Sequence, residues 1–128
     1  MRINGTIDFI ELEELKILLH DIFAGEDVIH KIRIFGDEFK IINAFHELYV
    51  MSFDPTNQNP MKKPRFSFEG DIKMDKQESV IEFNRITKVL NKNKSTYCIA
   101  YYPNEKDVKE EIEVMSENYW TTFDQMRN

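Results

Sequence analysis

The sequence contains little cysteine, glycine or proline. Among its 128 residues there are one cysteine, four glycines and four prolines. A single cysteine, Cys98, excludes an internal disulfide and is typical of a reducing compartment. Four glycines leave no room for a glycine-rich phosphate-binding loop, and no dinucleotide fingerprint or nucleophile elbow occurs. We therefore expect no cofactor, and we interpret Cys98, which lies in an apolar segment, as a buried core residue.

Long apolar runs are also missing. No segment approaches the roughly 20 apolar residues that span a bilayer, and no charged segment followed by an apolar run opens the chain. With 41% hydrophobic and 31% charged residues, we expect a soluble, cytoplasmic protein without a membrane partner. The net charge of −6 disfavours nucleic acid as a partner, because phosphate binding needs clustered Lys and Arg. We interpret the small basic cluster at Lys62, Lys63 and Arg65 as a solvated loop flank.

One strand pattern occurs twice in the chain. Residues 3–9 and 68–74 both alternate apolar and polar side chains, with Gly5 and Gly70 at the same inward-facing place. A helical pattern and further strands follow each copy. We predict an α+β fold, a mostly antiparallel sheet with two main helices on one face, in a single domain over residues 1–128. Two similar β-α-β-β halves, at about 1–53 and 65–115, favour a ferredoxin-like or related two-repeat sandwich.

The periodicity also places the individual elements. Helical spacing predicts a first helix from Leu12 to a stop at Gly25, then helices over 75–91 and 116–126, the last capped by Ser116. Alternation predicts strands over residues 2–9, 28–35, 38–43, 46–53, 66–73, 96–102 and 110–115. In the strand over 28–35 we expect Ile32 and Ile34 to face inward. Prolines and asparagines predict a long loop over 54–64.

The three histidines are the first candidates for chemistry. His20 lies on the polar face of the first helix, whereas His30 and His46 share strand faces with apolar residues. Their spacing fits no zinc motif, so we expect no metal site and assign no catalytic residue. One hypothesis is a small enzyme or ligand-binding domain with a site between the sheet and the 54–64 loop. Its ligand-binding residues would be His30, His46 and Asp54.

Acidic residues gather before an aromatic pair near the end of the chain. They are Glu110, Glu111, Glu113 and Glu117, and Tyr119 and Trp120 follow directly. Such a run often means only solvation, and the aromatic pair can serve only to pack the last helix. Acidic faces also complement basic partners, and Trp and Tyr are favoured interface anchors. Our leading hypothesis is a small acidic intracellular protein-binding module, such as an inhibitor or toxin-immunity-type protein. Its protein partner would be basic, and a homo-oligomer is compatible with the sequence.

The opening of the chain resembles one known family in part. Ile3-Asn4-Gly5, followed by a helix with Leu12, Leu15 and Leu19, is similar to the start of barstar-type ribonuclease inhibitors. The aromatic-rich inhibitory segment that this family carries next is absent. We therefore do not assign the chain to that family.

Overall fold

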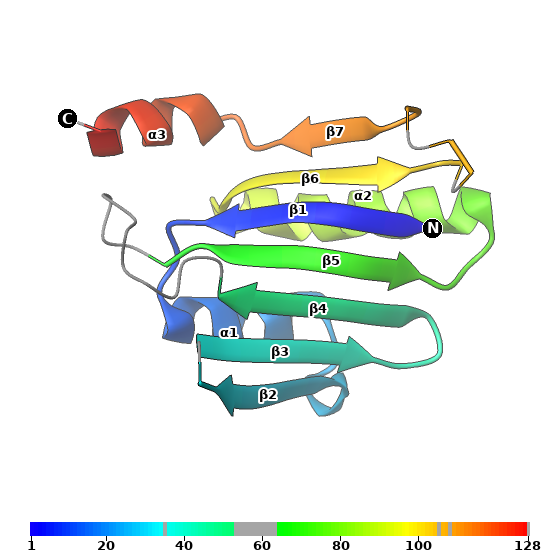
Figure 1. The fold of residues 1–128 in the computed structure, drawn as a ribbon, viewed down its shortest axis with the longest axis horizontal. Coiled ribbons are helices and arrows are strands. Elements are labelled where there is room, and N and C mark those ends of the chain that lie inside the picture. Colours follow the sequence, from blue (N-terminus) through cyan, green and yellow to red (C-terminus); the bar gives the residue numbers. More distant parts are fainter. Residues whose placement is uncertain (35, 53–63, 105, 108, 128) are drawn as a thin grey trace.

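A computed structural model describes residues 1–34, 36–52, 64–104, 106–107 and 109–127. The strands are β1 (Arg2–Asp8), β2 (Val28–Arg33), β3 (Gly36–Ile42), β4 (His46–Ser52), β5 (Phe66–Ile72), β6 (Thr96–Tyr102) and β7 (Ile112–Met115) (Figure 1). The helices are α1 (Leu12–Ile22), α2 (Lys76–Lys92) and α3 (Tyr119–Arg127), with a 3-10 turn, η1 (Gly25–Asp27). Among the described residues, no helix is both long enough and apolar enough to cross a membrane.

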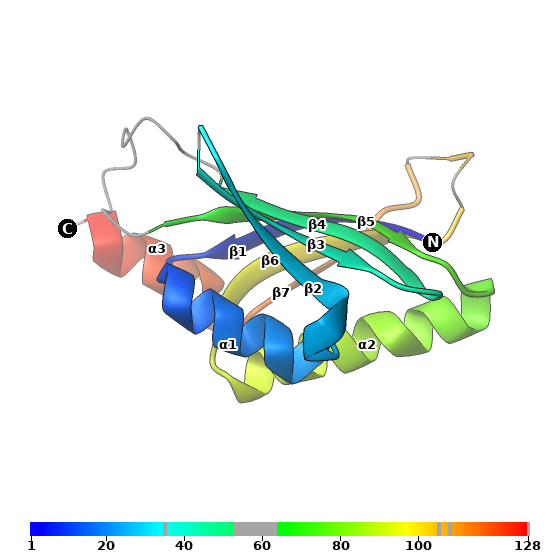
Figure 2. The same ribbon diagram turned by 90° about the horizontal axis from the view of Figure 1, so that it is seen from below.

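The strands form one seven-stranded sheet in the order β2-β3-β4-β5-β1-β6-β7. Every neighbouring pair is antiparallel. Both main helices, α1 and α2, lie against the same face of the sheet, and neither lies on the other face (Figure 2). The predicted α+β class, with a mainly antiparallel sheet and two main helices on one face, is therefore confirmed. We call the face without these helices the open face.

The two halves of the chain are not built alike. The connection through α1 carries the chain from β1 past β5, β4 and β3 to the edge strand β2. The connection through α2 joins β5 to β6 and passes only β1. The first half is therefore β-α-β-β-β and the second is β-α-β-β, followed by α3. The ferredoxin-like two-repeat layout that we predicted is not confirmed.

The two repeated strands, β1 and β5, lie side by side at the centre of the sheet. In their register, Gly5 faces Phe68 and Gly70 faces Ile3. A Cβ at Gly5 would lie 2.1 Å from the carbonyl oxygen of Cys98, and one at Gly70 would lie 2.0 Å from that of Glu47. Gly70 also has a φ of +144°, which side chains rarely tolerate. Both glycines therefore let a neighbouring strand approach closely.

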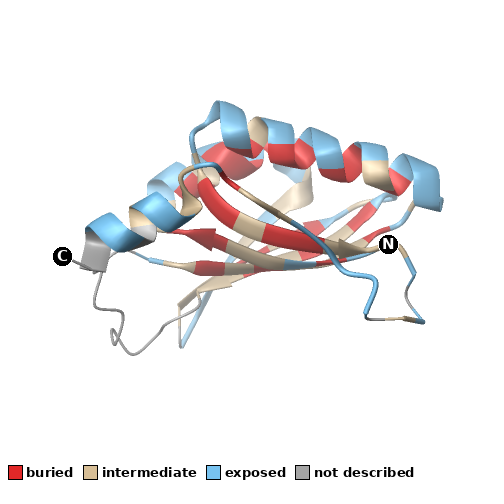
Figure 3. Cartoon of the chain, turned by 90° about the horizontal axis from the view of Figure 1, so that it is seen from above, coloured by how far each residue is buried: buried red, intermediate tan, exposed pale blue. Residues whose placement is uncertain are grey.

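The core lies between the sheet and the two helices. Figure 3 shows buried residues on the side of α2 that faces the sheet and exposed residues on its outer side. The inward residues of the central strands, such as Phe66 and Phe68, are fully buried, as their alternation predicted. Our prediction that Ile32 and Ile34 face inward into the core is wrong, because they are 84% and 95% exposed. They lie at the end of edge strand β2, beyond the apolar cover of the helices.

Several element ends differ from the predicted ones for identifiable reasons. Helix α1 ends at Ile22, and Gly25 begins the turn η1 rather than ending the helix. Helix α2 begins after Asp75, whose carboxylate accepts a hydrogen bond of 2.8 Å from the backbone N–H of Glu78. This is an N-cap that satisfies one of the unpaired N–H groups at the helix start. The predicted loop over 54–64 lies outside the described residues, except for Pro64.

Candidate protein-interaction surface

Strand β7 forms one edge of the sheet and, among the described strands, pairs with β6 alone. Its register places Val114 beside Ile99 and Ile112 beside Tyr101, on the helix side of the sheet. Val114 packs against the core, whereas Ile112 remains 43% exposed at the rim. Glu113 lies beside Ala100 on the open face. Strand β7 is therefore packed against the core through Val114, while Glu113 on the open face and Ile112 on the helix side remain exposed.

Ser116 fixes the chain between β7 and α3. Its buried hydroxyl accepts a hydrogen bond of 3.1 Å from the N–H of Tyr97, and its own N–H donates to the Tyr97 carbonyl at 2.9 Å. The carbonyl of Ser116 accepts from the N–H of Tyr119 at 3.0 Å. The predicted side-chain cap is therefore wrong, because the hydroxyl of Ser116 is used by β6. Helix α3 begins later, at Tyr119.

The aromatic pair opens α3. The rings of Tyr119 and Trp120 meet edge to face, with centroids 5.1 Å apart and an interplanar angle of 82°. Tyr119 is partly buried, and burial raises the pKa of its hydroxyl, with the charges of Asp8 and Cys98 adding to the effect. Trp120 is 64% exposed. Tyr119 thus packs the start of α3 toward the sheet, while most of the Trp120 side chain is accessible to solvent.

The four predicted acidic residues lie together with this pair along one edge of the molecule. Glu110 and Glu111 lead into β7, Glu113 lies within it, and Glu117 lies between β7 and α3. All four are exposed. Within the described part of the chain, no ion pair neutralises any of them. We call the set Glu110, Glu111, Glu113, Glu117, Tyr119 and Trp120 the β7–α3 surface.

Cys98 lies under this surface rather than in the core. It is half-buried on the open face of β6, so the prediction of a buried core cysteine is wrong. Burial raises the pKa of its thiol to about 11, and the neighbouring carboxylate of Glu113 adds to the effect. The thiol therefore stays protonated at neutral pH. Because the thiolate is the nucleophilic form, Cys98 is held inert.

A buried ion pair supports the same end of the open face. Asp8 accepts a hydrogen bond of 2.8 Å from the hydroxyl of Thr6 and one of 2.7 Å from Nε of Arg65. The guanidinium of Arg65 also lies 5.9 Å from the centre of the Phe9 ring. Arg65, interpreted as part of a solvated basic flank, is therefore a structural residue. Lys62 and Lys63 lie outside the described residues.

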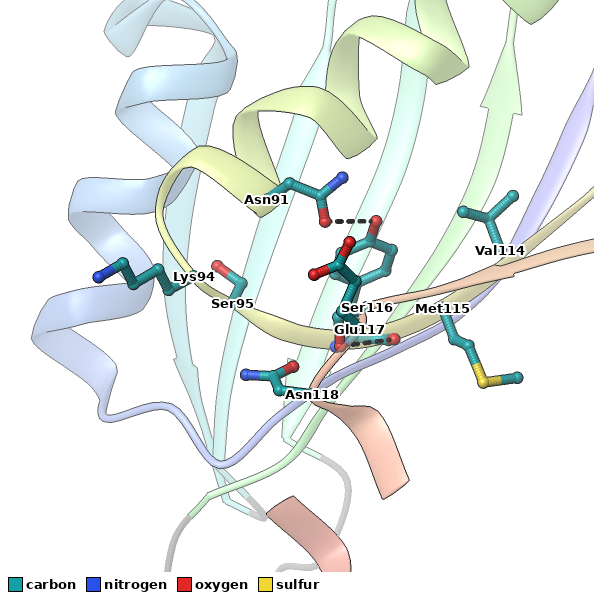
Figure 4. Close-up of a pocket in the computed structure, with 9 residues that line it drawn as sticks. Asn91, Lys94, Ser95, Val114, Met115, Ser116, Glu117 and Asn118 are labelled. Carbon is teal, nitrogen blue, oxygen red and sulfur yellow. Dashed lines mark hydrogen bonds between the residues drawn. The ribbon is translucent and has the colours of Figure 1, made fainter. Parts of the chain in front are cut away.

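A pocket of about 480 Å³ opens beside the β7–α3 surface. It is lined by residues of the α2 C-terminus, the start of β6 and the β7–α3 link: Asn91, Lys94, Ser95, Tyr97, Val114, Met115, Ser116, Glu117 and Asn118. Figure 4 shows the carboxylate of Glu117 directed toward Asn91 and the amine of Lys94 directed away. The hydroxyl of Tyr97 donates to Asn91 at 2.9 Å. The pocket therefore combines a carboxylate, amide and hydroxyl oxygens and an apolar wall.

His46, a candidate of the alternative hypothesis, lies in a buried network between β4 and α2. Its Nδ1 lies 2.9 Å from Oδ1 of Asn43, and its Nε2 bonds to the carboxylate of Glu82. The amide of Asn43 is oriented by its donation to Asp27 at 3.0 Å. Both ring nitrogens therefore face oxygen atoms of the protein. Both nitrogens are thus occupied within the protein.

Glu82 and Arg85 complete this network, and neither was predicted from the sequence. Nε of Arg85 donates to Glu82 at 2.5 Å, and its NH1 donates to the carbonyl of Ile22 at 2.9 Å. Burial opposes ionisation of Glu82, but hydrogen bonds from Arg85 and His46 outweigh it and lower the pKa of the carboxyl. The sequence feature that could have indicated this network is the position of Glu82, next to Phe83 on the buried face of α2. A carboxylate there requires a buried partner.

His30 lies apart from His46. It bonds to the carboxylate of Asp37 at 2.7 Å and stacks on Phe39 at 4.4 Å between ring centres. His30 on β2 lies beside Phe39 on β3, which lies beside Val50 on β4. His46 is four residues before Val50 on β4, so the two histidines are separated by two strand spacings and four residues. Strand geometry places the two histidines roughly 16 Å apart, so they do not share one site. Asp54 lies outside the described residues.

No protein-family model, no curated protein and no solved structure matches this chain. The surface geometry is therefore the sole basis for a functional proposal.

Proposed function

We propose that this protein is a small acidic protein-binding module that holds a basic partner on its β7–α3 surface. The observation that carries the proposal is the 64% exposed side chain of Trp120 at the start of α3, which follows a run of four exposed glutamates along the β7 edge. The ring of Trp120 meets that of Tyr119 edge to face, so the two aromatic side chains form one surface feature. Trp and Tyr contribute strongly to the energy of interfaces, especially when nearby polar groups surround them.

The arrangement supports a basic partner rather than an acidic one. Glu113 lies on the edge strand β7, and Glu110 and Glu111 lead into it, so a cationic segment of a partner that follows this edge would meet several carboxylates. Such complementarity accelerates association and excludes acidic proteins. The pocket beside Glu117 provides a place for one basic side chain, because its oxygens accept hydrogen bonds and its wall of Val114 and Met115 suits an aliphatic stem.

Tyr119 and Ser116 support a preorganised surface. The hydrogen bonds between Ser116 and Tyr97 fix the turn into α3, and the edge-to-face contact with Tyr119 orients the indole of Trp120. Binding to a fixed surface loses less conformational entropy than binding to a flexible one. A module of this kind would suit an inhibitor or immunity-type protein that covers a basic surface of its target in the cytoplasm.

Affinity capture with matched baits tests the proposal. Wild-type, Trp120→Ala and Ile81→Ala proteins are immobilised and exposed to an extract of the native host at low salt. Ile81 is the control, because it is a large exposed apolar side chain on α2. We expect the wild-type and Ile81→Ala baits to retain the same basic protein and the Trp120→Ala bait to lose it. Equal retention by all three baits, or no retention by any, would contradict the proposal.

A further inference from the structure

The edge of the sheet opposite to β7 carries a row of uncovered isoleucines. Strand β2 pairs only with β3 and forms the outer edge in Figure 1. On its helix side, Ile32 and the following Ile34 are 84% and 95% exposed, and on its open face Ile29 is 46% exposed. An edge strand also presents unpaired N–H and C=O groups on its outer side. Strand β2 therefore offers both apolar side chains and backbone hydrogen-bonding groups.

The open face at this edge is basic. Lys31 and Arg33 alternate with Ile32 on β2, and Lys40 lies beside Ile29 on β3. Among the described residues of β2 and β3, Glu38 supplies the one carboxylate on this face, and it pairs with Arg33 at 2.6 Å. The edge therefore keeps an excess of positive charge. In natural proteins, charged side chains on an edge strand prevent pairing with the edge strands of unsuitable partners.

Strand β7, at the other edge, carries the complementary pattern. Glu113 lies on the open face, and continuing the alternation places Glu111 there as well. Ile112 and Val114 lie on the helix side, where Ile112 is 43% exposed. Both edges thus alternate charge on the open face with apolar residues on the helix side, and the two charges have opposite signs.

The two edge strands also run in the same direction. Successive strands of the sheet are antiparallel, so β2, β4, β1 and β7 all point one way. A second copy shifted sideways in the plane of the sheet would bring its β7 alongside β2, with both helix faces on the same side. Glu111 and Glu113 would then meet Lys31 and Arg33, and Ile112 would meet Ile32.

We propose that β2 of one copy pairs with β7 of a second copy as parallel edge strands, so that the sheet continues from one copy into the next. Two-fold pairing of β2 with β2 would bring the cations of both copies together, and pairing of β7 with β7 would do the same for the carboxylates. Charge complementarity therefore selects the head-to-tail arrangement. Such a head-to-tail contact leaves one free β2 edge and one free β7 edge on every pair of copies, so further copies can add.

The proposed contact between copies and the proposed partner binding both use β7, but only the contact between copies uses β2. Glu111 and Glu113 belong to the β7–α3 surface, so a basic partner and a second copy compete for them. Lys31 and Arg33 do not belong to that surface. Changing β2 therefore removes self-association and leaves partner binding intact.

Sedimentation velocity on charge-swapped variants tests the proposal. For the wild type, we expect the average mass to rise with concentration above 15.3 kDa and to fall back when salt is raised from about 50 to about 500 mM. We expect Lys31→Glu/Arg33→Glu alone and Glu111→Lys/Glu113→Lys alone to stay monomeric. Mixed in equal amounts, the two variants regain complementary edges, and we expect them to associate.

Three results would overturn the proposal. They are a wild type that is monomeric at every concentration, association of either variant alone, and a mixture that stays monomeric although circular dichroism shows both variants folded. Affinity capture with the Lys31→Glu/Arg33→Glu bait separates this proposal from the proposed function. If that monomeric bait retains the partner, the proposed function is supported independently of the sedimentation result.

Discussion

The imidazole of His46, on β4, donates a hydrogen bond to the carboxylate of Glu82, on the inner face of α2. Both side chains are buried, and Arg85 and Asn43 complete their hydrogen bonds. The pair connects the helix layer to the sheet at a point where the surrounding contacts are apolar. A buried carboxylate of this kind favours one arrangement of helix on strand, because a displacement would leave its charge without hydrogen-bond donors.

We predict that Glu82→Ala lowers the free energy of unfolding by about 3 kcal/mol. The substitution leaves the buried ring of His46 and the guanidinium of Arg85 without their carboxylate partner. Urea denaturation followed by circular dichroism measures the change. The matched control is Glu78→Ala, an exposed glutamate on the same helix, for which we expect a loss within about 0.5 kcal/mol. Equal losses for both variants would contradict the role of the pair.

The stability contributed by Glu82 should depend on pH in one direction. Its pKa in the folded protein is lowered below the ordinary value of 4.5, so the folded state favours the ionised form. The contribution is therefore fully present above that value and is lost as pH falls through the folded pKa. We expect the stability difference between wild type and Glu82→Gln to shrink below pH 4.5. Denaturation curves at a series of pH values measure it, and a constant difference would count against this account.

Gly70→Ala should be far more damaging than Gly25→Ala. At Gly70 the new methyl group would lie 2.0 Å from the carbonyl oxygen of Glu47, at a φ of +144°. At Gly25 the nearest atom is Nδ1 of His20, at 3.3 Å, on a side chain that can move. We predict a loss of about 3 kcal/mol or more for Gly70→Ala and about 0.5 kcal/mol or less for Gly25→Ala. Thermal unfolding of the two variants gives the comparison, and similar melting temperatures would refute the close approach of β4 and β5.

Cys98 should react slowly with thiol reagents in the folded protein. With its pKa raised to about 11, the thiolate fraction at pH 8 is about a hundredfold smaller than for a free cysteine. We expect the rate of alkylation to be lower by at least that factor and to rise as pH approaches 11. The same protein unfolded in urea is the control, and it should react at the rate of free cysteine. Rapid labelling of the folded protein would show that the thiol is not held protonated.

The regular elements were predictable because they depend on local periodicity. Alternation in β1 and β5 and helical spacing in α1 reflect which residues face the core, and burial follows the same periods. Ile32 and Ile34 show the limit of this reasoning. Alternation assigns a residue to a face of the sheet, but it does not say how far the helix layer covers that face.

The network around His46 was not predictable for a different reason. His46 and Glu82 come together only because α2 packs on the face of the sheet toward which the side chain of His46 is directed. That placement depends on strand order, and the unequal crossovers of the two halves are not encoded in local patterns. The acidic and aromatic residues of the β7–α3 surface could be named from the sequence, because the charge and the ring of a side chain can be read without knowing the fold. Their place on an edge strand could not.

Calorimetric titration of the captured basic partner tests the central claim most directly. Wild type, Trp120→Ala and the control Ile81→Ala are titrated under the same conditions. If the partner binds to the β7–α3 surface, we expect Trp120→Ala to weaken binding about thirtyfold or more, because it removes an interface hot spot. We expect Ile81→Ala to bind with the affinity of the wild type. Wild-type affinity in Trp120→Ala would contradict the assignment of this surface.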